Sequence, residues 1–159
     1  MSVQTSYNSN SDVAFAGMKA DSGFDRVNSG IGESTIPFGH GLIAGTNAET
    51  QVKNADGAGV FRGISVHKHK EPSAAGVNDA EYADEEMVSA LTQGRIWCAV
   101  ETSVSGSIAI DDDVFINIDI GGAELGKVTD TVGTNIATGG KVIKVDVALK
   151  LAQIEINLP

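Results

Sequence analysis

Two histidines separated by one residue, His67 and His69, are the most chemically suggestive pair in this sequence. Alternate residues of a β-strand point to the same face, so such a pair can bind one metal ion. The neighbouring Lys68 and Lys70 make the local charge positive, which disfavours a cation. A third ligand would have to be His40 or a carboxylate brought near by folding. We interpret the pair as an exposed strand face, and keep a cupin-like metal enzyme using these three histidines as an alternative.

Three consecutive carboxylates, Asp111 to Asp113, are the second candidate for metal chemistry. Carboxylate oxygens are good calcium ligands, but the run lacks the D-x-D-x-D-G spacing of a dedicated calcium loop. A short acidic run between apolar segments more often closes a polar corner, with side-chain oxygens bound to the backbone. We expect such a corner here, with calcium binding as the alternative.

Covalent catalysis has little support in the sequence. Cys98 is the single cysteine, and strand alternation places it beside Ile96 and Val100 on an apolar face. A buried thiol has a raised pKa and is a poor nucleophile. There is no G-x-S-x-G motif for a serine hydrolase, and Gly57-Ala58-Gly59 lacks the context of a phosphate-binding loop. We therefore expect no catalytic residue, no metal and no cofactor.

Length and charge narrow the remaining classes of function. The chain has 159 residues, with 11 basic and 21 acidic side chains and a net charge of −10. Such a surface repels nucleic-acid backbones. No apolar run approaches the roughly 18 residues that span a bilayer, and the polar start is not a secretory signal. We expect a single acidic domain with neither a nucleic-acid nor a membrane partner.

The elements that would hold these residues are predicted to be strands. Glycine is abundant, at 19 residues, and short alternating or apolar runs recur between turn signals. The strand candidates are residues 36–43, 60–69, 95–101, 108–120 and the C-terminal segment from 143. Residues 81–92 fit a helix and a strand equally well. The predicted fold is all-β, a jelly-roll-like sandwich or a small β-barrel.

The C-terminal segment alternates strongly but changes phase. The apolar residues first occupy odd-numbered positions, and from Ile154 onward they occupy even-numbered positions. The odd-numbered set is Ile143, Val145, Val147, Leu149 and Leu151. A phase change without an evident turn residue is typical of a β-bulge. We favour a bulge near Leu151, with a helix-like bend over residues 148–152 as the alternative.

Residues 1–32 differ from the rest of the chain. They are rich in Ser, Asn, Asp and Gly, and their apolar residues are isolated. We predict an extended N-terminal arm over residues 1–32 and a single β domain over residues 33–159. The arm either has no fixed structure or becomes ordered on a partner, with Phe15, Met18, Phe24 and Val27 as anchors. Trp97 joins these candidate interface residues, because only Ala99 and Glu101 share its face of the predicted strand.

Several segments together resemble the structural cement, or decoration, proteins of tailed bacteriophages. The resemblance covers about residues 30–159 and is one of pattern more than of identity. It departs from the family over Asp79–Glu86, which is more acidic and helix-like. The matching segments are Ile36-Pro37-Phe38-Gly39, Phe61-Arg62-Gly63-Ile64, Tyr82 before Met87-Val88, Gly94–Val100, Asp113–Ile116 and Leu151–Pro159.

The resemblance implies a non-enzymatic protein of the virion. Such a protein is made in the bacterial cytoplasm, binds the outer surface of the major capsid protein lattice and stabilises the DNA-filled head. A homotrimer is the expected assembly, with a dimer as the alternative. The alternative function is another virion-surface β module, either carbohydrate-binding or associated with a tail fibre.

Overall fold

The computed structural model describes residues 14–20, 23–68, 81–118 and 122–158, and every regular element among them is a strand. Two of the elements, β7 and β10, are long, and the others have two to seven residues. The strands are β1 (Arg26–Gly32), β2 (Ile36–Pro37), β3 (Gly41–Ala44), β4 (Gln51–Asn54), β5 (Phe61–Ser65), β6 (Glu81–Tyr82), β7 (Met87–Ala99), β8 (Asp113–Ile116), β9 (Val128–Thr129), β10 (Ile136–Asp146) and β11 (Leu151–Asn157).

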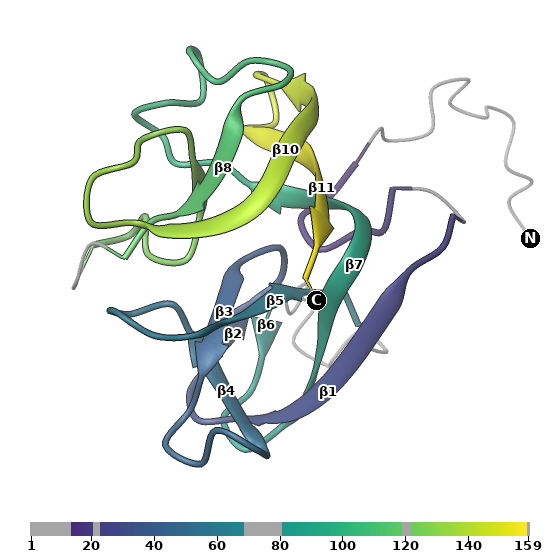
Figure 1. Cartoon of the computed structure of the whole chain (residues 1–159), viewed down its shortest axis with the longest axis vertical. Coiled ribbons are helices and arrows are strands. Elements are labelled where there is room, and N and C mark those ends of the chain that lie inside the picture. The colour runs from purple at the N-terminus through teal and green to yellow at the C-terminus, as the bar shows by residue number, and fades with distance from the viewer. Residues whose placement is uncertain (1–13, 21–22, 69–80, 119–121, 159) are drawn as a thin grey trace, which may run out of the picture.

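Nine of these strands form one sheet in the order β1-β4-β3-β5-β7-β11-β10-β8-β9, and β2 pairs with β6. Because β1 also pairs with β7, the strands β1, β4, β3, β5 and β7 close into a small barrel. Figure 1 shows this barrel below and the lobe containing β8 and β10 above, with β7 and β11 between them. The all-β prediction is confirmed, and its small-barrel form describes the closed half.

Strand β7 joins the barrel to the lobe, because each of its two edges pairs with two different segments of the chain. Residues 87–93 pair with β1 and residues 93–99 pair with β11 along one edge. The other edge pairs with β5 at Ala90 and Leu91, and then with Lys19, which forms a bridge to Ile96. The change of partner occurs around Gly94, whose φ of 123° is unfavourable for other residues.

The two faces of the sheet bury two main clusters of apolar side chains. One fills the barrel beneath β2 and β6, and the larger one lies between the barrel wall and the lobe formed by β8, β10 and β11. The barrel cluster comprises Ile36, Phe38, Leu42, Val52, Tyr82, Val88 and Ala90. The larger cluster includes Ile43, Ile64, Leu91, Ile96, Cys98, Val114, Ile116, Val142, Ile154 and Ile156.

The alternation predicted for residues 95–101 is confirmed. Ile96, Cys98 and Val100 are all buried in the larger cluster. The segment 81–92, which fits a helix and a strand equally well in sequence, contains β6 and the first half of β7. The β conformation is favoured because β1 and β5 both supply backbone partners to β7 there.

The phase change near Leu151 is produced by a turn, so the predicted bulge at that point is wrong. Residues 147–150 connect β10 to β11, and Lys150 adopts a φ of 53° there. The backbone N–H of Leu149 donates a hydrogen bond to Asp146 Oδ1 at 3.0 Å. An Asp side chain and a left-handed lysine thus build a turn without glycine. A register shift does occur in β10, between Val142 and Lys144.

The predicted N-terminal arm is part of the fold over much of its length. Residues 26–32 form β1, which closes the barrel, and residues 14–20 lie along β7. The apolar side chains of this segment are spaced too widely to indicate a strand on their own, but the edges of β7 provide the missing backbone partners. Residues 1–13 lie outside the described residues, so the arm stays a prediction for them.

Replacing Gly63 tests how closely β5 approaches β7. Gly63 has a φ of 124°, and a Cβ atom there would lie 2.3 Å from the Leu91 carbonyl oxygen. We expect Gly63→Ala to lower the free energy of unfolding by more than about 1 kcal/mol, since the backbone conformation and the contact are both incompatible with a side chain. Gly106→Ala is the control, because a Cβ there meets nothing within 4 Å. Equal denaturant midpoints for the two variants would contradict this account of the barrel.

Candidate interaction surface

Residues 14–20, which we call the N-terminal strap, are held to β7 by backbone hydrogen bonds. The Gly17 N–H donates to the Trp97 carbonyl at 2.7 Å, and the Trp97 N–H donates to the Met18 carbonyl at 2.9 Å. The Ala20 N–H donates to the Arg95 carbonyl at 2.9 Å. The strap therefore behaves as an additional short strand on the edge of β7 that β5 leaves open.

Gly17 fixes the strap against the barrel. Its φ is 81°, and its carbonyl accepts a hydrogen bond from the His67 N–H at 2.8 Å. A Cβ atom at residue 17 would lie 2.7 Å from that same nitrogen. The Phe15 and Phe38 rings both contact the His67 ring, with centroids 4.5 and 4.8 Å away. His67 thus packs between aromatic side chains instead of forming part of an exposed strand face.

Trp97 lies under the strap and is only 4% exposed. It clusters with Ala14 and Leu151, and Ala16, Met18 and Ala20 pack against this group. The Lys144 ammonium lies 5.9 Å from the ring centroid. The alternation along β7 places Trp97 on the outer face of the strand, as the sequence indicates. The strap, however, covers it.

Three other predicted interface residues are accessible, and one of them, Phe15, is 47% exposed on the strap. Phe24 is 88% exposed, at the point where the chain crosses β7 beside Gly94, and Val27 is 40% exposed on β1. Ile31 and Met87, opposite each other in the β1–β7 register, are exposed as well. We call Phe24, Val27, Ile31 and Met87 the outer β1 patch. Met87 was not among the sequence candidates, because its segment was ambiguous.

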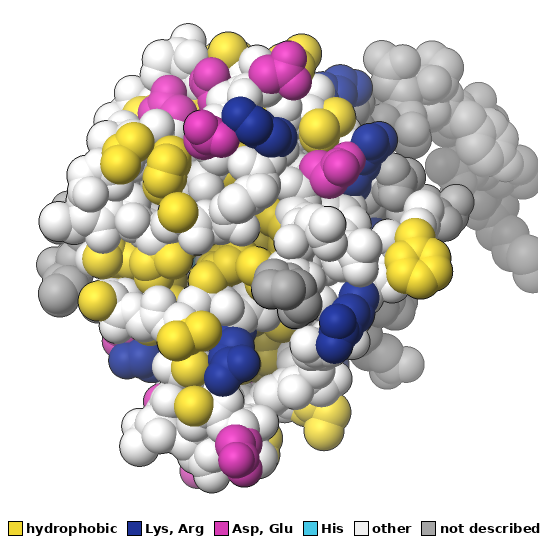
Figure 2. All heavy atoms as spheres, viewed as in Figure 1, with side chains coloured by type: hydrophobic (Ala, Val, Ile, Leu, Met, Phe, Trp, Pro, Cys, Tyr) yellow, Lys and Arg dark blue, Asp and Glu magenta, His cyan; other side chains and the backbone are white. Residues whose placement is uncertain are grey.

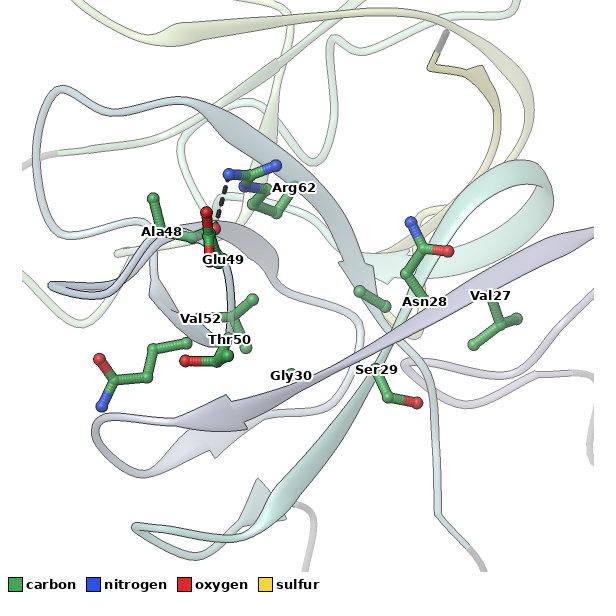
Figure 3. Close-up of a pocket in the computed structure, with 11 residues that line it drawn as sticks. Val27, Asn28, Ser29, Gly30, Ala48, Glu49, Thr50, Val52 and Arg62 are labelled. Atoms are coloured by element: carbon green, nitrogen blue, oxygen red, sulfur yellow. Dashed lines mark hydrogen bonds between the residues drawn. The ribbon is translucent and has the colours of Figure 1, made fainter.

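A polar groove of about 430 Å³ runs along the edge of β1. Figure 3 shows Val27–Gly30 on one side of it, and Ala48–Thr50 with Arg62 on the other. The Gly32 N–H donates toward β7, to the Glu86 carbonyl, whereas the Ile31 N–H donates to the Thr50 carbonyl. Because backbone groups alternate along a strand, those of Ser29 face the groove and present an edge that an extended chain can pair with.

The candidate chemical groups are positioned for structural roles. His40 is buried, and this burial, assisted by the nearby Lys127, lowers its pKa to about 4, so the imidazole is neutral at pH 7. Burial raises the pKa of the Cys98 thiol. His69 lies outside the described residues, so the proposed three-histidine site cannot be assembled from them. Within the described ranges, no group of three His, Cys, Asp or Glu residues could hold a metal ion.

The acidic run forms the expected polar corner. Asp112 Oδ2 accepts a hydrogen bond from the Ala109 N–H at 2.7 Å, and Asp111 has a φ of 72°. The Lys141 ammonium lies 2.8 Å from Asp113 Oδ1 and donates to the Asp111 carbonyl. In Figure 2, carboxylates gather at the top of the view, over the lobe that contains β8 and β10. The corner is thus built from backbone and lysine contacts.

Comparisons with known proteins add a family and a fold. A family model described as "Structural cement protein (E217 gp24/Pam3 gp6)" matches residues 3–157. A solved chain from "The capsid of Myoviridae Phage XM1" has a TM-score of 0.75 at 14% identity, covering 99% of this chain and 98% of that chain. A likeness to a solved structure at 14% identity shows that the two chains share a fold. No curated protein matches the sequence, and no helix in the described part of the chain could cross a membrane.

Displacing the strap should expose Trp97. In Gly17→Ala, the added Cβ meets the His67 nitrogen, and the backbone conformation costs roughly 1–3 kcal/mol. We expect a red-shifted tryptophan emission and stronger acrylamide quenching than in the unmodified protein. Gly57→Ala is the control, since a Cβ there meets nothing within 4 Å. Identical spectra for both variants would show that the strap does not depend on Gly17.

His40 should make stability fall in acid. Its pKa is lowered from 6.5 to about 4, so the neutral form stabilises the folded state fully above pH 6.5, and this contribution is lost as the pH falls toward 4. The complete effect corresponds to about 3 kcal/mol. Denaturant unfolding at pH 7 and pH 4.5 should show a smaller loss of stability for His40→Gln than for the unmodified protein. Equal losses would contradict a buried neutral imidazole.

Proposed function

This chain belongs to the structural cement protein family of phages, and we propose that it binds the outer surface of the major capsid protein lattice and stabilises the DNA-filled head. Membership makes it a capsid-associated structural protein of the virion. The match over residues 3–157 is the observation that carries this conclusion, because it covers almost the whole chain. The association with the major capsid protein follows from the family, and the details below are our proposal.

The physical properties of the chain suit a structural role. The barrel and the lobe share one long strand, and the single thiol is buried. The net charge of −10 favours solubility before assembly through self-repulsion. A cement protein acts by many repeated contacts over a lattice, so each contact can be weak while the whole shell gains strength.

We place the principal contact at the outer β1 patch. Phe15, Met18, Phe24, Val27 and Trp97 are the interface residues expected from the sequence, and Phe24 is the most accessible of the five. Burying a Phe side chain contributes about 1.5–3 kcal/mol. Trp97 would take part only if the strap moves, whereas Phe24 and Val27 need no rearrangement.

The N-terminal arm and the oligomer complete the proposal. Residues 1–13 precede the strap, and a chain of that length spans at most about 45 Å when extended; we propose that it contacts a neighbouring subunit. The edge of β1 in the polar groove would accept an extended segment by strand addition, which gains affinity from main-chain hydrogen bonds. We propose a trimer at three-fold positions of the lattice, with a dimer as the alternative, since closed symmetric oligomers are the rule.

Expanded heads that lack the protein provide the direct test. The purified chain should co-sediment with these heads and raise the temperature at which they release DNA. A chain without residues 2–13 tests the arm in the same assay, and light scattering on the free protein gives the oligomeric state. Failure of the full chain to bind heads would overturn the proposed function.

Phe24→Ser should weaken head binding by about 10- to 100-fold, because a Phe side chain is no longer buried at the interface. The matched control is Val60→Ser, which removes an apolar side chain exposed to 65% elsewhere on the surface. Both variants should unfold at the same temperature as the unmodified chain, since neither side chain is part of a core cluster. Unchanged binding of Phe24→Ser would exclude the outer β1 patch as the principal contact.

A further inference from the structure

The turn between β10 and β11 carries apolar side chains into solvent. We call residues 147–150 the hairpin tip; Val147 is 58% exposed and Leu149 is 50% exposed. Turns are dominated by Gly, Pro, Asn, Asp and Ser, which suit the turn backbone by conformation or by side-chain hydrogen bonds. Two large aliphatic side chains within four residues of a turn therefore form an apolar protrusion that nothing in the described chain covers.

The hairpin tip is held in a defined conformation. Asp146 Oδ1 accepts a hydrogen bond from the Leu149 N–H at 3.0 Å, and the Lys150 N–H donates to the Val147 carbonyl at 3.3 Å. The Val100 N–H donates to the Lys150 carbonyl at 3.0 Å, which ties the turn to the end of β7. A partner would therefore meet a preorganised surface, and binding would cost little ordering entropy.

Lys150 occupies a position that glycine or asparagine would fill with less strain. Its φ of 53° is in the left-handed region, which costs a residue with a Cβ roughly 1–2 kcal/mol. A lysine at this position is explained if its ammonium group binds a partner. Strained backbone positions of this kind are concentrated at functional sites.

The tip also concentrates cations that have no ion pair. Most of the described basic residues pair with a carboxylate, namely Lys19, Lys53, Lys68, Arg95, Lys127 and Lys141. Among the described basic residues, no ion pair is formed by Arg26, Arg62, Lys144 or Lys150. Lys150 lies in the tip and Lys144 lies two residues before Asp146, with its ammonium 5.9 Å from the Trp97 ring centroid, in a chain with a net charge of −10. The only carboxylate of the hairpin end, Asp146, is already bound to the turn backbone.

We propose that the hairpin tip inserts Val147 and Leu149 into an apolar depression on the major capsid protein that is bordered by carboxylates, with Lys144 and Lys150 pairing with that border. This inference rests on the proposed function and adds a second contact to the outer β1 patch. Charge complementarity identifies the occupant, because two unpaired lysines around an apolar centre fit an acidic rim. On a second copy, the outer β1 patch adjoins Arg26, a further cation without an ion pair that would repel Lys144 and Lys150, so a second copy is the poorer partner.

Lys150→Gly separates binding from folding. Glycine relieves the left-handed conformation, so the variant should unfold at the same or a higher temperature. Loss of the ammonium should nevertheless weaken binding to expanded heads by about tenfold at low salt, and reduce the salt dependence of binding. The matched control is Glu85→Gly, which relieves a φ of 60° at another exposed position and should leave head binding unchanged.

Val147→Ser with Leu149→Ser tests the apolar part of the tip. We expect at least a tenfold loss of head binding with unchanged thermal unfolding, whereas Val132→Ser, exposed to 62% elsewhere, should bind normally. If the unmodified chain binds heads and the tip variants bind equally well, the hairpin tip is not a capsid contact. If the tip variants instead lose self-association in light scattering and keep head binding, the occupant is a second copy and the proposal is overturned. Failure of the unmodified chain to bind overturns the proposed function itself.

Discussion

The backbone of β7 imposes the constraint on which the whole structure depends. A strand of 13 residues must satisfy hydrogen-bonding groups on both edges, and no single neighbour is long enough to do so. β1 and β11 share one edge, while β5 and the N-terminal strap share the other. The first half of β7 therefore belongs to the barrel and the second half to the lobe. The change of partners around Gly94 marks the boundary between them.

The strands could be predicted from sequence wherever burial alternates with exposure. Ile154 and Ile156 are buried and share a face, because the residues that alternate with them, Glu155 and Asn157, are polar and exposed. The turn before Leu151 could not be found in the same way, since it uses Asp146 and a left-handed lysine instead of glycine or proline. The alternation also groups Val147 and Leu149 with Ile143 and Val145 on one strand face, whereas both lie exposed in this turn.

The candidate surface was harder to predict because it depends on long-range pairing. Phe24 and Val27 are exposed, as residues that contact a partner must be, and their role as anchors stays a prediction. Trp97 occupies an alternate position of β7 that faces away from the larger core cluster, yet the strap covers it. The sequence of residues 14–20 has no pattern that predicts a strand. Met87 lies at the surface, opposite Ile31 of β1. A sequence read one segment at a time contains no information on such cross-strand neighbours.

The barrel closes through a short parallel seam. β1 and β4 share only two residue pairs, Ile31 with Gln51 and Gly32 with Val52, and parallel ladders are slightly weaker per residue than antiparallel ones. Local opening of a protein begins where few hydrogen bonds must break. Thermal breathing at this seam would widen the polar groove while β7 and the larger core stay closed. A partner that approaches this wall thus meets a seam of only two residue pairs, which can open locally while the rest of the fold stays intact.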